Sequence, residues 1–329
     1  MKNGNAGFFD TIKICDLGVA INCNFQCKMC YFWKNRGCSD KVMSISDWKA
    51  LIGQLQTLFP PDLKVIFSGF GEVLLRRGVE ELLCLSASKF KVGLNSNGYL
   101  IDEPMARLIA RNVESLSLSL DGVKPRTHDY IRGKSGAHAA VVEAVELLRR
   151  QSENMFIHIN TVIMEYNIDE IIDLVKWVDA RNINGIILQA VSMPMFTPLD
   201  RYWYKNKFSF LWPKEKNKIE ELIDRLIECK QNGSKIVNSI RQLQCFKSYF
   251  FDPEKAIEAL HCEVDRALKI DPEGNVRICA FSDPIGNVKT VSLPDILNSE
   301  LAETEREKAS HCQTPCHLLV NCFHDQEDA

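Results

Sequence analysis

Apolar stretches of strand length alternate with longer amphipathic stretches between residues 11 and 191. This alternation is typical of parallel β-strands joined by crossover helices. We expect six strands, at residues 12–21, 63–67, 91–95, 115–120, 156–163 and 185–190. Helices are expected between them, at residues 46–58, 79–88, 103–111, 139–150 and 168–180, and Ser46 has the character of an N-cap.

Both faces of the central strands are interpreted as apolar. Helices would then cover one face, and packed side chains or a ligand would fill the other. The predicted fold class is therefore α/β, as an open or partial (β/α)6 barrel of the TIM type over residues 1–195. In such barrels the chemistry lies at the carboxyl ends of the strands.

The regular alternation stops after residue 195. Residues 196–255 are expected to form a connector, in which an aromatic-rich stretch from Phe196 to Trp212 precedes a charged helix at 214–231. The aromatic stretch either shapes the mouth of a substrate pocket or packs the connector onto the barrel. Residues 256–329 are expected to form a small cysteine-rich domain with a β-hairpin turn at 271–275.

Composition narrows the class of protein. The 329 residues are 46% hydrophobic and 25% charged, which is enough to bury a large core and excludes a disordered chain. Lys and Arg total 40 against 43 Asp and Glu, so the formal charge of -3 disfavours nucleic acid as a partner. The chain has no secretory h-region and no apolar run of about 18 residues, so we expect a cytoplasmic protein that does not enter a membrane.

The 13 cysteines are unevenly distributed, since three crowd near residue 25 and five lie between residues 262 and 322. This clustering favours metal binding over disulfides. Cys23, Cys27 and Cys30 form a C-x3-C-x2-C loop directly after the first expected strand. Three thiolates hold a [4Fe-4S] cluster with one iron open to an outside ligand, whereas structural zinc takes four closed ligands. The alternatives are a zinc site completed by Cys38 or simple buried thiols.

Residues 23–30, with the sequence CNFQCKMC, resemble the signature of the radical SAM superfamily. Residues 68–73 (SGFGEV) resemble the Gly-Gly-Glu-Pro motif of that family, which holds the methionyl amino group of S-adenosylmethionine (SAM). Phe70 and Val73 stand where glycine and proline are usual. Further motifs of the family are matched in order on successive strand ends, at 95–98 (NSNG), 117–122 (SLSLDG) and 128–133 (HDYIRG). Each motif is weak alone, and their shared order makes the resemblance specific.

The resemblance implies that Cys23, Cys27 and Cys30 hold the catalytic [4Fe-4S] cluster and that SAM chelates its open iron. It also implies that SAM contacts these residues: Phe32, Gly71, Glu72, Asn97, Ser119 and Arg132. Ser119 would contact the ribose or carboxylate of SAM, and Arg132 its carboxylate, as a charge-assisted pair. One electron, from a donor such as flavodoxin or ferredoxin, would cleave SAM into methionine and a 5'-deoxyadenosyl radical, which takes a hydrogen atom from the substrate.

The C-terminal cysteines resemble the SPASM or shorter twitch domains that carry auxiliary clusters in this superfamily. The resemblance implies one auxiliary [4Fe-4S] cluster, held by four of these cysteines: Cys262, Cys279, Cys312, Cys316 and Cys322. Cys262 and Cys279 are expected ligands because the hairpin brings them together, and the choice of the other two stays open. A zinc ribbon uses the same residue types and is the alternative. His311, His317 and His324 are expected at the surface.

A fully ligated auxiliary cluster accepts or relays an electron, which favours net oxidation of the substrate. Few residues precede the first expected strand and the C-terminal domain is short, which disfavours a fused leader-binding domain and favours a sugar-like or alcohol small molecule. A peptide maturase stays open, as does a radical epimerase in which Cys245 donates a hydrogen atom. Outside the enzymes, the alternative is a zinc-binding interaction protein. Cys15, Cys84 and Cys229 are expected to be core or incidental residues.

Overall fold

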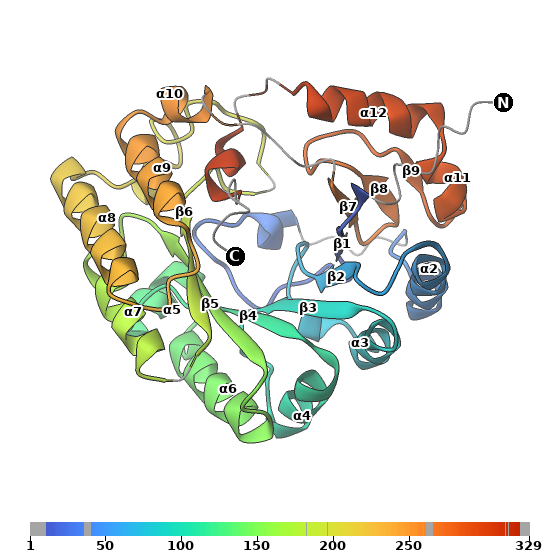
Figure 1. Cartoon of the computed structure of the whole chain (residues 1–329), viewed down its shortest axis with the longest axis horizontal. Helices are drawn as coiled ribbons and strands as arrows, with labels where there is room; N and C mark the ends of the chain where they lie inside the picture. Colours follow the sequence, from blue (N-terminus) through green and yellow to red (C-terminus); the bar gives the residue numbers. More distant parts are fainter. Residues whose placement is uncertain are drawn as a thin grey trace.

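The computed structural model describes residues 11–35, 41–181, 183–195, 197–258, 260, 266–312, 314 and 316–322. The strands form one sheet in the order β6-β5-β4-β3-β2-β1-β7-β8-β9. Figure 1 shows this sheet curving round, with the helices arranged outside it. The predicted α/β class and the parallel partial barrel are therefore confirmed.

The first six strands are all parallel and neighbour one another in chain order. They are β1 (Ile14–Leu17), β2 (Lys64–Phe67), β3 (Lys91–Ser96), β4 (Ser115–Ser119), β5 (Phe156–Ile163) and β6 (Gly185–Ala190). β5 and β6 have the predicted bounds, whereas β1 is much shorter than the predicted 12–21. Its ladder ends because the chain bends there, with Val19 N donating to Leu17 O at 3.1 Å.

Five of the six crossover helices lie close to their predicted positions, whereas the helix at Pro125–Arg132 was not predicted. The six are α2 (Ile45–Leu58), α3 (Val79–Ala87), α4 (Glu103–Asn112), α5 (Pro125–Arg132), α6 (Ala137–Gln151) and α7 (Ile171–Asp179). The N-cap of α2 is Ser44 and not the predicted Ser46. Ser44 Oγ accepts from Asp47 N at 3.1 Å, and Ser44 N donates to Asp47 Oδ2 at 2.7 Å. Only Ser44 is three residues before a carboxylate that completes this capping box.

The two faces of the sheet differ in polarity, which corrects the prediction that the central strands are apolar on both. In β4, Leu116 and Leu118 are fully buried in a core that includes helix residues such as Val141. The alternate residues Ser117 and Ser119 are half-buried on the other face, which lines the inside of the barrel. The strand therefore has a period of two, because only its helix-facing side is shielded from water.

The segment that follows β6 covers the open edge of the sheet. Its helices are α8 (Lys216–Gln231), α9 (Ile240–Phe251) and α10 (Pro253–Glu258). Before α9, Ile236 pairs with Ile186 as an extra bridge, and the Asn238 side chain exchanges two hydrogen bonds with Leu188 at 2.7 and 2.8 Å. These contacts satisfy backbone groups that an uncovered edge strand would leave unpaired.

The C-terminal hairpin continues the same sheet on the far side of β1 (Figure 1). β7 (Ala267–Ile270) pairs parallel with β1, and β8 (Asn275–Arg277) and β9 (Gly286–Asn287) follow as antiparallel neighbours. The predicted turn at 271–275 is confirmed, since Asp271 Oδ1 accepts from Glu273 N and Asn275 N at 2.9 and 3.0 Å. Helices α11 (Leu293–Leu297) and α12 (Glu300–Ser310) follow the hairpin, and a 3-10 helix at His317–Asn321 follows them.

The division of the chain at residues 195 and 255 stays a prediction, because the sheet runs through both the barrel and the C-terminal hairpin. None of the helices formed by the described residues has the length and apolar character needed to span a membrane.

Candidate active site

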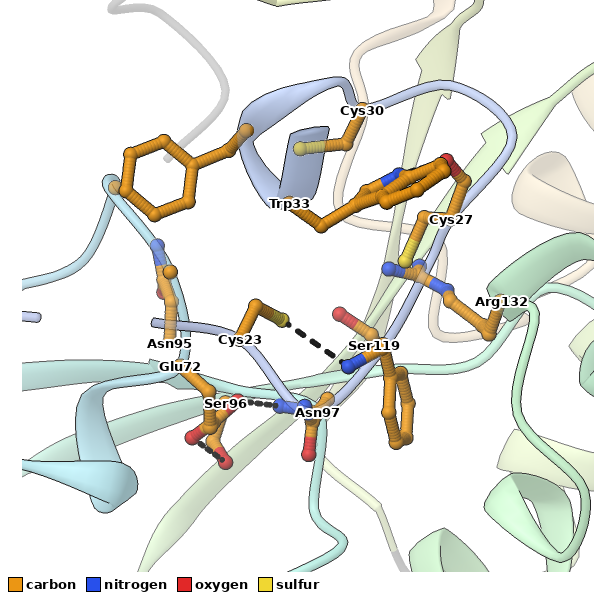
Figure 2. A pocket seen from close by; sticks show the side chains of 14 residues that line it. Cys23, Cys27, Cys30, Trp33, Glu72, Asn95, Ser96, Asn97, Ser119 and Arg132 are labelled. Carbon is orange, nitrogen blue, oxygen red and sulfur yellow. Dashed lines mark hydrogen bonds between the residues drawn. The ribbon is translucent and has the colours of Figure 1, made fainter. Parts of the chain in front are cut away.

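A cavity of about 180 Å³ lies where the chain leaves the carboxyl ends of β1 to β4. All nine residues predicted for the catalytic cluster and SAM line it (Figure 2). They are Cys23, Cys27, Cys30, Phe32, Gly71, Glu72, Asn97, Ser119 and Arg132. The strand-end placement inferred from the motif order is thus what the fold produces, and the roles of these residues stay proposals.

The cysteine loop is anchored to the C-terminal end of α5. Gln26 N donates to Arg132 O at 3.1 Å, and Lys28 N donates to Ile131 O at 2.9 Å. Gly133 follows with φ +62, and a Cβ there would lie 2.4 Å from Gln26 O. Only glycine permits this close approach, so the helix end and the cysteine loop are fixed together.

Three thiols face the cavity. Burial raises the pKa of Cys23 and of Cys30, and it raises the pKa of Cys27 to about 12, while the Arg132 charge acts in the opposite direction on all three. Among the described residues, no three His, Cys, Asp or Glu side chains converge closely enough for a single metal ion. Thiols arranged round a shared space suit a polynuclear cluster, which would bind them as thiolates.

Glu72 braces the loop that follows β2. Its Oε1 accepts from Ser96 Oγ at 2.8 Å and from Leu74 N at 3.2 Å, and its Oε2 accepts from Asn97 N at 2.8 Å. Burial raises the pKa of Glu72, and these donors lower it. Because the carboxylate is occupied within the protein, it fixes the end of β3 to the loop rather than standing free in the cavity.

The same loop presses against the cysteine loop at Gly71. Glu72 N donates to Asn22 O at 2.9 Å, and a Cβ on Gly71 would lie 2.3 Å from that oxygen. Phe70, one of the two departures from the family motif, is accommodated by Gly18, where a Cβ would lie 2.3 Å from the Phe70 ring. The Phe70 ring then meets Phe32 edge to face, with 6.2 Å between ring centroids.

Asn97 ties β3 to the cysteine loop. Its Nδ2 donates to Asn24 Oδ1 at 2.8 Å, and its Oδ1 accepts from Tyr99 N at 3.0 Å. Trp33, which no motif indicated, also lines the cavity and donates from Nε1 to Cys27 O at 3.3 Å. The sequence carries no periodic signal for Trp33, since it lies in the 3-10 turn Phe32–Asn35 after the cysteines.

A second cavity, of about 280 Å³, adjoins the first and shares Cys30, Ser119 and Arg132 with it. Its further lining comes from the ends of β5 and β6 and from the C-terminal segment, and includes Asn160 and Gln189. The buried Asn160 Oδ1 has no hydrogen-bond partner among the described residues. Cys245 lies on α9 and is not one of the residues that line either cavity.

The C-terminal cysteines form a separate group. Cys279, Cys312 and Cys316 line a third cavity, of about 190 Å³. Cys322 is exposed and is not one of its lining residues, and the predicted ligand Cys262 lies outside the described residues.

His317 corrects the expectation that the C-terminal histidines are at the surface. It is buried, with Nε2 3.1 Å from Arg201 O and Nδ1 2.9 Å from Tyr249 Oη. The reason is the aromatic stretch, which packs the connector onto the barrel around this ring, as the centroids of Trp203 and His317 at 6.1 Å indicate. His311 is exposed, and His324 lies outside the described residues.

Comparison with protein families finds two matches. The model of the radical SAM superfamily matches residues 19–178, and the SPASM model, an iron-sulfur cluster-binding domain, matches residues 262–323. The SPASM match favours an iron-sulfur cluster over a zinc ribbon as the metal site of the C-terminal cysteines.

Curated relatives match different shares of the chain. An AdoMet-dependent heme synthase of Methanosarcina barkeri is 31% identical over 155 residues, which is 46% of this chain and 43% of that protein. The subtilosin biosynthesis protein AlbA of Bacillus subtilis is 23% identical over 312 residues, covering 92% of this chain and 62% of AlbA. The chain therefore spans less than two thirds of either relative.

Solved structures share the fold. SuiB of Streptococcus suis, bound to SAM, superposes with a TM-score of 0.66 at 16% identity, covering 95% of this chain and 72% of SuiB. SuiB has also been solved with its precursor peptide SuiA, with a TM-score of 0.65. At this identity the likeness concerns the fold alone.

Proposed function

The chain belongs to the radical SAM superfamily and carries a C-terminal SPASM domain, and from this premise we propose that it cleaves SAM reductively to start radical chemistry on a substrate. The observation that carries the proposal is the cavity in which the three cysteines and the six predicted SAM contacts meet. These residues come from the ends of four strands and from the end of helix α5, so their meeting is a property of the fold.

The residues of the chain have distinct proposed roles. Cys23, Cys27 and Cys30 hold the cluster, which when bound supplies the electron that breaks the sulfonium bond of SAM. Arg132 offers its positive charge to the carboxylate of SAM, and Ser119 lies beside it at the cavity wall. Glu72 keeps the surrounding loops in place, so the cavity is preorganised before SAM enters.

The second cavity is the proposed substrate site. Arg132 is the only charged side chain among its described lining residues, and Asn160 and Gln189 supply neutral hydrogen-bonding groups. We therefore propose a substrate that presents neutral polar groups, such as a sugar-like or alcohol small molecule. Loss of a hydrogen atom, followed by transfer of one electron to the auxiliary cluster and release of one proton, would oxidise it. Cys279, Cys312 and Cys316 would hold that cluster together with a fourth ligand.

Peptide modification is the second candidate. It is supported by AlbA and SuiB, the one a bacteriocin biosynthesis protein and the other solved with a precursor peptide, which align with more than nine tenths of this chain. A single polar side chain of a peptide would fit the same cavity. Epimerisation with Cys245 as hydrogen donor has less support, because Cys245, on α9, is not among the lining residues of either cavity.

Reductive cleavage of SAM is tested on protein reconstituted anaerobically with iron and sulfide, then given SAM and dithionite. We expect 5'-deoxyadenosine, detected by mass spectrometry, from the wild type and none above background from Cys27→Ala. Cys84→Ala is the matched control, because Cys84 is exposed on α3, and it should keep wild-type activity. An equal amount of 5'-deoxyadenosine from the Cys27→Ala variant would contradict the proposed cluster site.

The substrate class is tested by adding cell extract separated by mass. Small-molecule and peptide fractions are each added to the same assay, and the rate of SAM consumption is compared. Stimulation by the low-mass fraction alone supports the small-molecule proposal. Stimulation by the peptide fraction alone contradicts it and favours the second candidate. An electron donor such as flavodoxin or ferredoxin is proposed to replace dithionite in the cell.

A further inference from the structure

A buried ion pair stands directly behind one of the three cysteines. Arg132 Nε lies 2.6 Å from Asp121 Oδ2, and the Arg132 charge acts on the Cys27 thiol, whose pKa it lowers. Figure 2 shows the guanidinium beside the sulfur of Cys27. One cation thus bridges a proposed cluster ligand and a carboxylate.

Both charges are shielded from solvent. The Arg132 side chain is 12% exposed and the Asp121 side chain 0% exposed. Burial alone would lower the pKa of Arg132, but the Asp121 carboxylate raises it, so the guanidinium keeps its charge. Charges in such surroundings interact more strongly with a neighbouring group than exposed charges do, because water and salt screen them less.

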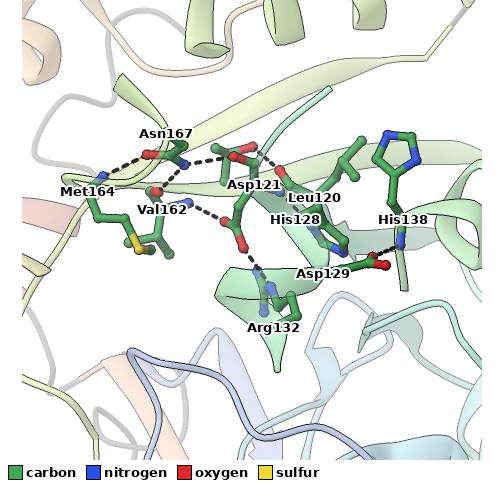
Figure 3. Close-up of polar contacts among 10 residues, drawn as sticks. Leu120, Asp121, His128, Asp129, Arg132, His138, Val162, Met164 and Asn167 are labelled. Carbon is green, nitrogen blue, oxygen red and sulfur yellow. Dashed lines mark hydrogen bonds and ion pairs between the residues drawn. The ribbon is translucent and has the colours of Figure 1, made fainter. Parts of the chain in front are cut away.

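The carboxylate is held in place from several sides (Figure 3). Asp121 Oδ1 accepts from Val162 N at 3.0 Å, and the Asp121 backbone accepts from Asn167 Nδ2 at 2.8 Å. Asp121 N donates to His128 Nδ1 at 3.0 Å. Because the backbone of Arg132 also accepts from the cysteine loop, the guanidinium and Cys27 are positioned by the same helix end.

We propose that this ion pair sets the reduction potential of the cluster at Cys23, Cys27 and Cys30, with Arg132 raising the potential and Asp121 lowering it. The proposal rests on the cluster assignment made above. Asp121 acts through Arg132 as a positioning residue and also through its own charge.

The signs of these two effects on the reduction potential follow from electrostatics. Reduction adds one negative charge to a cluster, and hydrogen bonds to its sulfurs are one of the factors that tune its potential. A cation beside a ligating sulfur stabilises the reduced state more than the oxidised state. A nearby anion has the opposite effect, which is weaker here because Asp121 lies behind Arg132.

The test is a redox titration of the reconstituted protein followed by electron paramagnetic resonance. The variants are Arg132→Gln, Asp121→Asn and the double variant. A protein with all three N-terminal cysteines changed to alanine supplies the spectrum of the auxiliary cluster for subtraction. Arg107→Gln is the matched control, since it removes an exposed arginine paired with Glu103 at 2.8 Å.

We expect a more negative midpoint potential for Arg132→Gln, a less negative one for Asp121→Asn, and an intermediate value for the double variant. The control should match the wild type. A purely structural pair would lower cluster content in both single variants without opposite shifts, and that result would overturn the inference.

The double variant keeps the test decisive if Arg132→Gln leaves Asp121 unpaired and the protein misfolds. Its potential must then lie below that of Asp121→Asn, and equality would count against the inference. Wild-type protein that cleaves SAM while all potentials coincide refutes this inference alone. Wild-type protein that takes up no N-terminal cluster refutes the proposed function and the inference with it.

Discussion

Single glycines decide whether the two loops of the active site can meet. Gly71 has φ +127 and no room for a Cβ, whereas Gly69 in the same loop has φ +79 and open space around it. The first position combines an unfavourable backbone conformation with a clash against Asn22 O, and the second has the conformational cost alone.

We therefore expect Gly71→Ala to abolish SAM cleavage and SAM binding, because the clash forces the loop away from the cysteines. Gly69→Ala should cost about 1 kcal/mol of stability and lose less SAM affinity than Gly71→Ala, although Gly69 also lines the cavity proposed for SAM. SAM affinity by isothermal titration and 5'-deoxyadenosine formation check both variants. Equal losses in the two variants would mean that conformational strain, and not the contact with Asn22, governs the loop.

At the scale of residues, the family resemblance named the residues that line the first cavity, and sequence reasoning missed what depends on tertiary contact. The cysteine and glycine motifs could be placed because each follows a strand whose end is visible in the hydrophobic pattern. The roles of Asp121 behind Arg132 and of Glu72 between two loops depend on partners 11 and 25 positions away. His317 was wrongly expected at the surface, because polarity alone does not reveal an aromatic enclosure.

Helix α5 is joined to the end of β4 through a histidine that the fold keeps neutral. His128 is fully buried, and its Nδ1 accepts from Asp121 N. Burial, together with the Arg132 charge, lowers the pKa of His128 to about 3. The unfolded chain takes up a proton on this side chain below about pH 6.5, whereas the folded chain does not do so until about pH 3.

The contribution of His128 to stability is therefore complete above pH 6.5 and is lost as the pH falls from 6.5 to about 3. The loss amounts to up to about 1.4 kcal/mol for each pH unit. We expect His128→Asn to lose less free energy of unfolding than the wild type between pH 7.5 and pH 5.5, measured by urea denaturation. The exposed His311 supplies the control variant His311→Asn, which should follow the wild type. A His128→Asn profile parallel to the wild type would contradict this assignment.

At the scale of elements, the order of the six parallel strands and the bounds of β5 and β6 followed from the hydrophobic pattern. The helix α5, the end of β1 and the polarity of the inner strand faces did not. β1 is short because its apolar run continues into a bend, which a pattern cannot distinguish from a strand. The inner face of β4 is a row of serines, because a parallel sheet closed around a cavity needs only one apolar side. Ser44 caps α2 through Asp47, a reciprocal contact that the prediction of Ser46 overlooked.

At the scale of the molecule, the auxiliary site divides the C-terminal cysteines. Cys279, Cys312 and Cys316 share a cavity, and Cys322 is exposed outside that set. We expect Cys279→Ser to lose the iron and sulfide of the auxiliary cluster after reconstitution, whereas Cys322→Ser keeps them. Iron and sulfide analysis of the two proteins checks this. Loss of the cluster in Cys322→Ser would place that thiol among the ligands.

The pairing of β7 with β1 was the part of the whole fold that the sequence did not indicate. Both strands are short, and nothing in their periodicity marks them as partners. Lys269 and Asp16, which lie 253 positions apart in the chain, come within 3.5 Å across this pair. Long-range pairing of this kind is decided by the complete tertiary structure.

The pairing of β7 with β1 has a consequence for the nascent chain. A ribosome adds about 5–20 residues each second, so β1 emerges on the order of tens of seconds before β7 exists. During that interval one side of β1 offers unpaired backbone groups, close in sequence to the three thiols of the cysteine loop. The strand that precedes the cysteine loop is thus among the first to be synthesised and among the last to gain its second neighbour in the sheet. A chain truncated before residue 266 therefore leaves that edge of β1 open to aggregation.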